Sequence, residues 1–120
     1  MRLCKYKPTG VFYAIKILKK KEILRLKQVE HILNEKSILT DIEHPFIVNL
    51  RCTFQDSRHV HLVMDYVIGG EFFTHLRRHR RFNNKTAQFY AAHIVLVFQY
   101  LHAKDIVYRD LKPEVRARAH

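Results

Sequence analysis

The chain has 120 residues, enough for one domain of common size, and 48% of them are hydrophobic against 28% charged. This balance excludes an intrinsically disordered chain and favours a globular one. The formal net charge of +11 is compatible with a nucleic-acid or anionic-surface partner. The basic residues form short runs without interleaved aromatic residues, however, so a solvated face is the preferred interpretation.

The two cysteines and nine histidines bear on redox and metal chemistry. Cys4 and Cys52 have no Cys-x-x-Cys spacing, which argues against a disulfide framework or a structural zinc site and favours a reducing compartment. Two histidine pairs are regularly spaced, His59 with His61 and His75 with His79. No carboxylate or cysteine completes a ligand set for the second pair, so surface histidines without a metal are expected.

The first expected elements are two strands joined by a hairpin turn. Residues 11–18 are aliphatic, branched or aromatic apart from Lys16, and the turn-forming residues 8–10 precede them. Residues 2–7 are then the partner strand. A lysine within a buried strand needs an anionic partner or ligand.

A helical segment follows. Residues 21–42 contain neither glycine nor proline, and their apolar side chains recur every three or four positions, which predicts a short helix followed by a longer one. Glu35 shares the spacing of Ile32 and Leu39, so it lies on or beside the apolar face. Lys16 and Glu35 are therefore expected to be each other's partner.

Two further strands and two further helices are expected, at residues 46–54, 59–67, 72–80 and 86–102. The last segment approaches the length of a membrane span of about 18 residues. Its glutamine, histidine and tyrosine side chains favour a helix buried in a soluble core instead. The start of the chain has no apolar stretch typical of a signal peptide. Strands with one helix pair, followed by helices, predict an α+β fold of two lobes.

Three motifs occur in an order that identifies a family. Ala14-Ile15-Lys16 on a strand matches most of Val-Ala-Ile-Lys, Glu35 follows on a helix, and residues 108–114 (YRDLKPE) resemble the catalytic loop His-Arg-Asp-x-x-x-x-Asn. Residues 2–114 thus resemble a serine/threonine protein kinase, close to the cAMP-dependent type. The stretches 26–31 (LKQVEH) and 89–92 (FYAA) point to this type more specifically.

The resemblance implies a partial protein-kinase-like fold of the α+β class, with a small-lobe antiparallel sheet and a helix followed by the first helices of the large lobe. Residues 1–114 would form a partial kinase domain. Residues 1–67 would be the small lobe without its Gly-rich loop, and residues 68–114 the start of the large lobe to the catalytic loop. Residues 115–120 are expected to be an unrelated tail.

The resemblance also implies a nucleotide site. Lys16 would hold the α- and β-phosphates of ATP, and Glu35 would fix that lysine through an ion pair. The adenine pocket would be lined by Ala14, Val48, Met64, Asp65 and Val67, with the backbone after Met64 acting as the hinge between the lobes.

Catalytic and substrate-binding roles follow in the same way. Asp110 would accept or orient the substrate hydroxyl proton, and Lys112 would offset charge on the transferred phosphoryl group. Glu71 and Glu114 resemble the acidic pair that reads arginine upstream of the phosphorylated residue, and Glu71 is expected to contact the nucleotide as well. Arg109 would meet a phosphate on the activation loop.

The sequence departs from the family pattern at the expected Mg²⁺ site. Val115 occupies the position of the metal-binding asparagine, and its side chain has no oxygen for a hard cation. The aspartate of Asp-Phe-Gly would come later and the Gly-rich loop before Arg2. Activity by this chain alone is therefore not expected, and no residue is predicted as a metal ligand.

At the level of the family, the predicted function is ATP-dependent phosphorylation of serine or threonine in basic-flanked proteins. The expected cofactors are ATP and Mg²⁺, and the expected partners are substrates with upstream arginine and cAMP-binding regulatory subunits, in the cytoplasm or nucleus. No nucleic acid and no membrane span are expected.

One alternative is a non-catalytic module that competes for partners of a full-length kinase. The alternative with least support is a basic nucleic-acid-binding domain.

Overall fold

The computed structural model describes residues 1–69 and 72–108. The chain divides into two compact units, one formed by Met1–Glu43 with Val48–Tyr66 and the other by His44–Ile47 with the residues from Val67 onward. The first unit contains four strands and two helices, and the described part of the second contains two helices. This α+β content agrees with the fold class that the sequence predicts.

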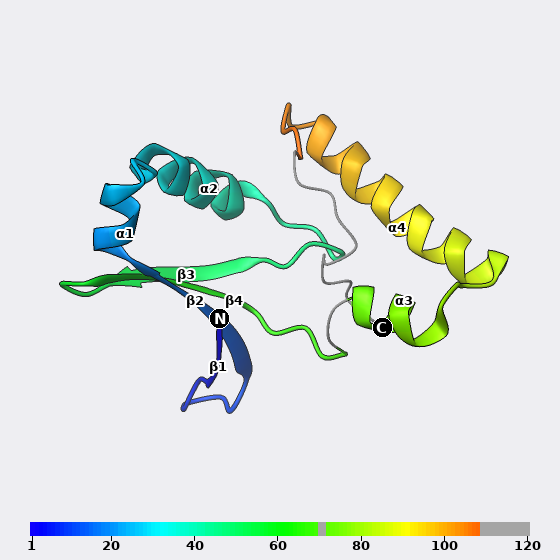
Figure 1. Ribbon diagram of the computed structural model, residues 1–120, viewed down its shortest axis with the longest axis horizontal. Coiled ribbons are helices and arrows are strands. Elements are labelled where there is room, and N and C mark those ends of the chain that lie inside the picture. The colour runs from blue at the N-terminus through cyan, green and yellow to red at the C-terminus, as the bar shows by residue number, and fades with distance from the viewer. Residues whose placement is uncertain (70–71, 109–120) are drawn as a thin grey trace. The chain divides into compact units, whose positions relative to one another are not determined.

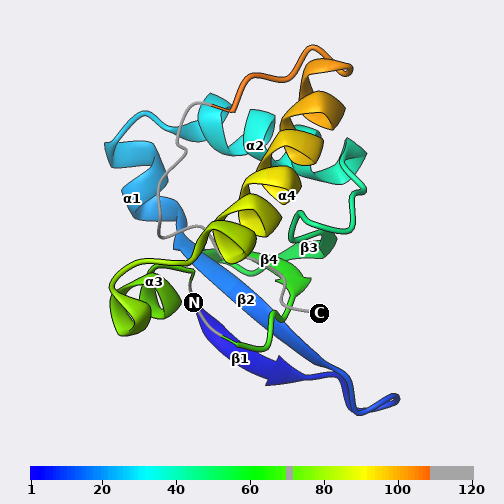
Figure 2. The same cartoon turned by 90° about the vertical axis from the view of Figure 1, so that its right-hand side faces the viewer.

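The first unit, called the sheet unit here, is built on one antiparallel sheet with strand order β1-β2-β4-β3. The bounds of its strands are β1 Arg2–Lys5, β2 Phe12–Lys19, β3 Leu50–Gln55 and β4 His59–Asp65. Figure 2 shows β2 running between β1 and β4. The observed β3 begins later than the predicted 46–54, because residues 46–47 form a turn and belong to the other unit. The observed β4 ends earlier than the predicted 59–67, and Val67 already belongs to the other unit.

Turn chemistry closes the first hairpin as predicted. Gly10 has a φ of +74°, the left-handed conformation that glycine adopts without steric cost. Its N–H donates to the carbonyl of Tyr6 at 2.7 Å, and the Tyr6 N–H donates to the carbonyl of Val11 at 2.8 Å. These two bonds connect β1 to β2.

Two helices follow β2, α1 at Lys20–Arg25 and α2 at Val29–Asp41, which confirms a short helix before a longer one. Lys27 between them has a φ of 52°, which ends the first helix and redirects the chain. In Figure 1, α2 lies over one face of the sheet. The buried core of this unit is small and includes Ala14, Ile42 and Leu62.

The second unit, called the helical unit here, contains α3 at Phe72–His79 and α4 at Asn84–His102. The Asn83 side chain caps α4 by accepting the Thr86 N–H at 2.8 Å. Phe72 packs edge-on against Tyr90 with ring centroids 4.7 Å apart, which joins the two helices. None of the helices within residues 1–69 and 72–108 combines the length and hydropathy of a membrane-crossing segment.

The expectation that α4 is buried in a core is wrong for most of its length. Leu101 is its one buried residue, whereas Phe89 is 55% exposed and Val95 is 53% exposed. The helix contacts aromatic residues on only part of its surface, such as Phe46, whose ring centroid lies 3.9 Å from that of His93. Helical periodicity predicts an apolar face but not the neighbours that would cover it.

Leu62 offers a test of the sheet unit's core. It is 1% exposed, so Leu62→Ala should lower the free energy of unfolding by about 2–5 kcal/mol through lost apolar contacts and a residual cavity. The matched control Leu24→Ala removes the same atoms from a side chain that is 66% exposed. This control should change the free energy of unfolding by less than about 0.5 kcal/mol. Urea unfolding followed by circular dichroism measures both, and equal losses would contradict the assigned core.

Candidate functional site

The ion pair between Lys16 of β2 and Glu35 of α2 is the centre of the candidate site. Lys16 Nζ lies 2.7 Å from Glu35 Oε1, so the partnership expected from the sequence is present. The two side chains are 34% and 38% exposed, which makes the pair half-buried rather than enclosed in the core. Lys16 therefore has a carboxylate on one side while part of its side chain remains accessible to solvent.

Strand alternation explains why Lys16 faces α2. Side chains two positions apart in a strand share a face, and residues directly opposite in an antiparallel pair share it too. Lys16 is opposite Leu62, and Ala14 is opposite Met64. Ala14 and Met64, two of the expected adenine-pocket residues, therefore lie on the same face as Lys16. Val48 also belongs to the sheet unit and is half-buried in the segment before β3.

Asp65 is placed differently from Met64. Its carboxylate is on the opposite face of β4, is 9% exposed, and forms a two-point ion pair with Arg51, at 2.6 Å to Nε and 3.1 Å to the terminal nitrogen. The Asn49 side-chain amide donates to the same carboxylate at 3.4 Å. This hydrogen-bonded contact with Asp65 raises the pKa of Arg51. The Asp65 side chain is therefore directed away from the face of Lys16, and the expected nucleotide contact of this residue would involve its backbone.

The remaining predicted site residues lie elsewhere in the chain. Val67 belongs to the helical unit, where it is 5% exposed. The other residues with predicted catalytic, nucleotide or substrate roles lie outside the described residues: Glu71, Asp110, Lys112 and Glu114. Their roles stay predictions from the family motif.

Two polar groupings in the sheet unit were not predicted from the sequence. The first is the Arg51–Asp65 pair described above, which depends on an irregular register: Leu50 pairs with Met64 and Cys52 with Val63, so Arg51 is an extra residue in β3. The second brings Asp56 to His59 and His61 at the β3–β4 turn. The sequence carried one signal for the second grouping, because Asp56 precedes His59 by only three residues.

The chemistry of the Lys16 site suits an anionic ligand. A lysine ammonium has three donors, and its contact with Glu35 leaves others for phosphate oxygens. The side chains of Ala14, Leu62 and Met64 form an apolar surface next to it on the same face. Protein kinases use ATP with Mg²⁺ in general, and Val115, which the family motif aligns with a metal-binding asparagine, has no side-chain oxygen for such an ion.

Comparison with known proteins gives a consistent result. Residues 1–115 match the protein kinase domain family. The chain is 58% identical over 105 residues to the cAMP-dependent protein kinase catalytic subunit of Dictyostelium discoideum, which covers 88% of this chain and 16% of that protein. It is 56% identical over 105 residues to the cAMP-dependent protein kinase type 3 of Saccharomyces cerevisiae, with coverage of 88% and 26%.

A human relative, the cAMP-dependent protein kinase catalytic subunit PRKX, is 46% identical over 114 residues, covering 95% of this chain and 32% of that protein. The chain thus spans between about a sixth and a third of the length of these relatives. The family match extends over nearly all of its residues, including the segments that carry Lys16 and Glu35. This chain belongs to the protein kinase domain family.

Proposed function

We propose that this chain is the ATP-binding portion of a serine/threonine protein kinase, whose activity is transfer of the γ-phosphoryl group of ATP to protein hydroxyls. The observation that carries the proposal is the Lys16–Glu35 ion pair of 2.7 Å on the face that also carries Ala14 and Met64. In this arrangement Lys16 binds the α- and β-phosphates, and the apolar side chains next to it receive the adenine ring.

The energetics of the pair favour a binding role over a structural one. Ion pairs between side chains this exposed stabilise a fold by about 0–1 kcal/mol, because solvent screens them and ordering two long side chains costs entropy. A phosphate held by the same ammonium gains a charge-assisted hydrogen bond in a partly apolar environment. The pair therefore matters more for a ligand than for the fold.

The proposed substrates and partners follow from the relatives' names and from the family motif. The proposed substrates are proteins with arginine upstream of the modified serine or threonine, read by Glu71 and Glu114. The proposed catalytic residues are Asp110, which orients the hydroxyl, and Lys112, which offsets phosphoryl charge. cAMP-binding regulatory subunits are proposed partners, because relatives of this chain are named as cAMP-dependent protein kinases. The proposed location is the cytoplasm or the nucleus.

Nucleotide binding provides the direct test. Lys16→Met should weaken binding of a fluorescent ATP analogue about tenfold or more, because a charged hydrogen bond worth ~1.5–3 kcal/mol is lost. The matched control is Lys19→Met, since Lys19 is 65% exposed, contacts Glu22 at 3.4 Å, and lies on the opposite face of β2. Fluorescence titration of both variants measures the effect. An unchanged affinity in Lys16→Met, or an equal loss in Lys19→Met, would rule out the proposed site.

A double-mutant cycle tests the small structural contribution of the pair. The coupling free energy between Lys16→Met and Glu35→Gln in urea unfolding should be below about 1 kcal/mol, as for exposed ion pairs. Each single variant should also bind the nucleotide more weakly than the parent chain, because Glu35 orients the Lys16 ammonium. A coupling of several kcal/mol would instead assign the pair a mainly structural role.

Phosphoryl transfer is expected to separate from nucleotide binding in this chain. Because Val115 replaces the expected metal-binding asparagine, transfer of labelled phosphate to an arginine-containing serine peptide should not exceed that of Asp110→Ala. ATP-analogue binding should be equal in the two proteins. Measurable turnover that Asp110→Ala abolishes would show that the chain catalyses transfer despite Val115.

A further inference from the structure

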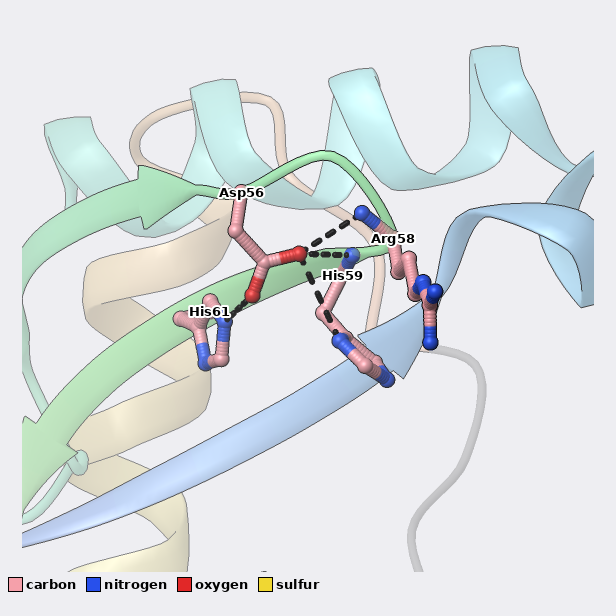
Figure 3. Close-up of polar contacts among 4 residues, drawn as sticks. All are labelled: Asp56, Arg58, His59 and His61. Carbon is pink, nitrogen blue, oxygen red and sulfur yellow. Dashed lines mark hydrogen bonds and ion pairs between the residues drawn. The ribbon is translucent and has the colours of Figure 1, made fainter.

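The turn between β3 and β4 brings together three potential metal ligands, as Figure 3 shows. Asp56 Oδ2 lies 3.1 Å from His61 Nε2, and Asp56 Oδ1 lies 3.4 Å from His59 Nδ1. One ligand atom from each residue can be chosen so that all three lie within 4.8 Å of one another. Two imidazoles and one carboxylate form a donor set that suits zinc and related ions.

This cluster is separate from the Lys16 site. His59 is opposite Lys19 and His61 is opposite Ile17 in the β2–β4 ladder, so both histidines are on the other face of the sheet from Lys16 and Leu62. Their rings help to line an open hollow of about 420 Å³ together with Met1, Arg2, Ile17 and Lys19. The nucleotide site therefore does not use these side chains.

One pair of ligand atoms already has the separation of a tetrahedral site. With metal–ligand bonds of about 2.0–2.1 Å, neighbouring ligand atoms of a tetrahedron are separated by about 3.3 Å. The contact of Asp56 Oδ2 with His61 Nε2, at 3.1 Å, is close to this value. His59 contacts the other carboxylate oxygen, and the three ligand atoms lie within 4.8 Å of one another, so the His59 ring would move closer when an ion binds. A bound ion would take the place of the proton that joins His61 to the Asp56 carboxylate.

The ligands are also held in position by the surrounding chain. Asp56 Oδ1 accepts the backbone N–H groups of Arg58 and His59, both at 2.7 Å, which fixes the carboxylate over the turn. The His61 ring stacks on Phe54, with centroids 4.5 Å apart and an interplanar angle of 8°.

We propose that Asp56, His59 and His61 form a binding site for a divalent transition-metal ion of the zinc type. Three protein ligands leave a fourth position open to water or to an exchangeable ligand, on the side of the open hollow. The cationic residues nearby reduce the affinity for the ion. Arg2 and Lys19 both line the hollow, and the Lys19 ammonium contacts Glu22 at 3.4 Å.

Titration of the full chain with Zn²⁺ under reducing conditions tests this proposal. Histidine-ring NMR should show saturable changes at His59 and His61 with one ion bound per chain. His59→Asn, His61→Asn and Asp56→Asn should each weaken binding about tenfold or more. Binding of Co²⁺, followed by visible absorption, should show the bands of a tetrahedral nitrogen–oxygen site and no thiolate charge-transfer band.

The control is His75→Asn. His75 and His79 also have ligand spacing, but their ring nitrogens contact main-chain oxygens of Gly69 and His75 at 2.5 and 2.9 Å. Zinc affinity should be unchanged in this variant. Equal affinity in His61→Asn and the parent chain, loss of binding in His75→Asn, or absent ring shifts at His59 and His61 would each overturn the proposal. The ring shifts are measured on the unaltered chain and therefore do not depend on whether a variant folds.

Discussion

The pairing of β2 with β4 determines which side chains can act together in this chain. The register sets Lys16 opposite Leu62 and Ile17 opposite His61, so one face of the two strands carries the ammonium and the other carries the histidines. Because side chains alternate with a period of two, a slip by one residue would exchange these faces. Both proposed sites, on opposite sides of one sheet, therefore depend on the same ladder of backbone hydrogen bonds.

The two ion pairs of the sheet unit have different physical roles. Asp65 is 9% exposed, and a buried carboxylate without a cation would be costly, so its contact with Arg51 serves mainly to satisfy a charge inside the fold. The Lys16–Glu35 pair is about one-third exposed on both sides, where solvent could satisfy either charge alone. Its position on the same face as Ala14 and Met64 agrees with the proposed nucleotide site.

Local chemistry made much of the sheet unit predictable. The Gly10 turn, the helix pair after β2 and the partnership of Lys16 with Glu35 all follow from periodicity, turn residues and charge. Non-local packing set the features that the sequence did not reveal. The extra residue at Arg51 depends on how β3 aligns with β4, and the exposure of α4 depends on which segments cover it. Neither is encoded within a short window of sequence.

His61 and Leu62 are adjacent in β4, and their side chains point to opposite faces of the sheet. An ion bound to the His61 ring would therefore restrain the backbone of Leu62, which lies opposite Lys16 in the ladder. Such a restraint couples the two faces only if the metal and the nucleotide each bind one geometry of the strand more tightly than another, since a ligand shifts an equilibrium by its differential affinity alone. The short separation, one peptide unit within a paired strand, makes β4 the element through which any coupling would pass.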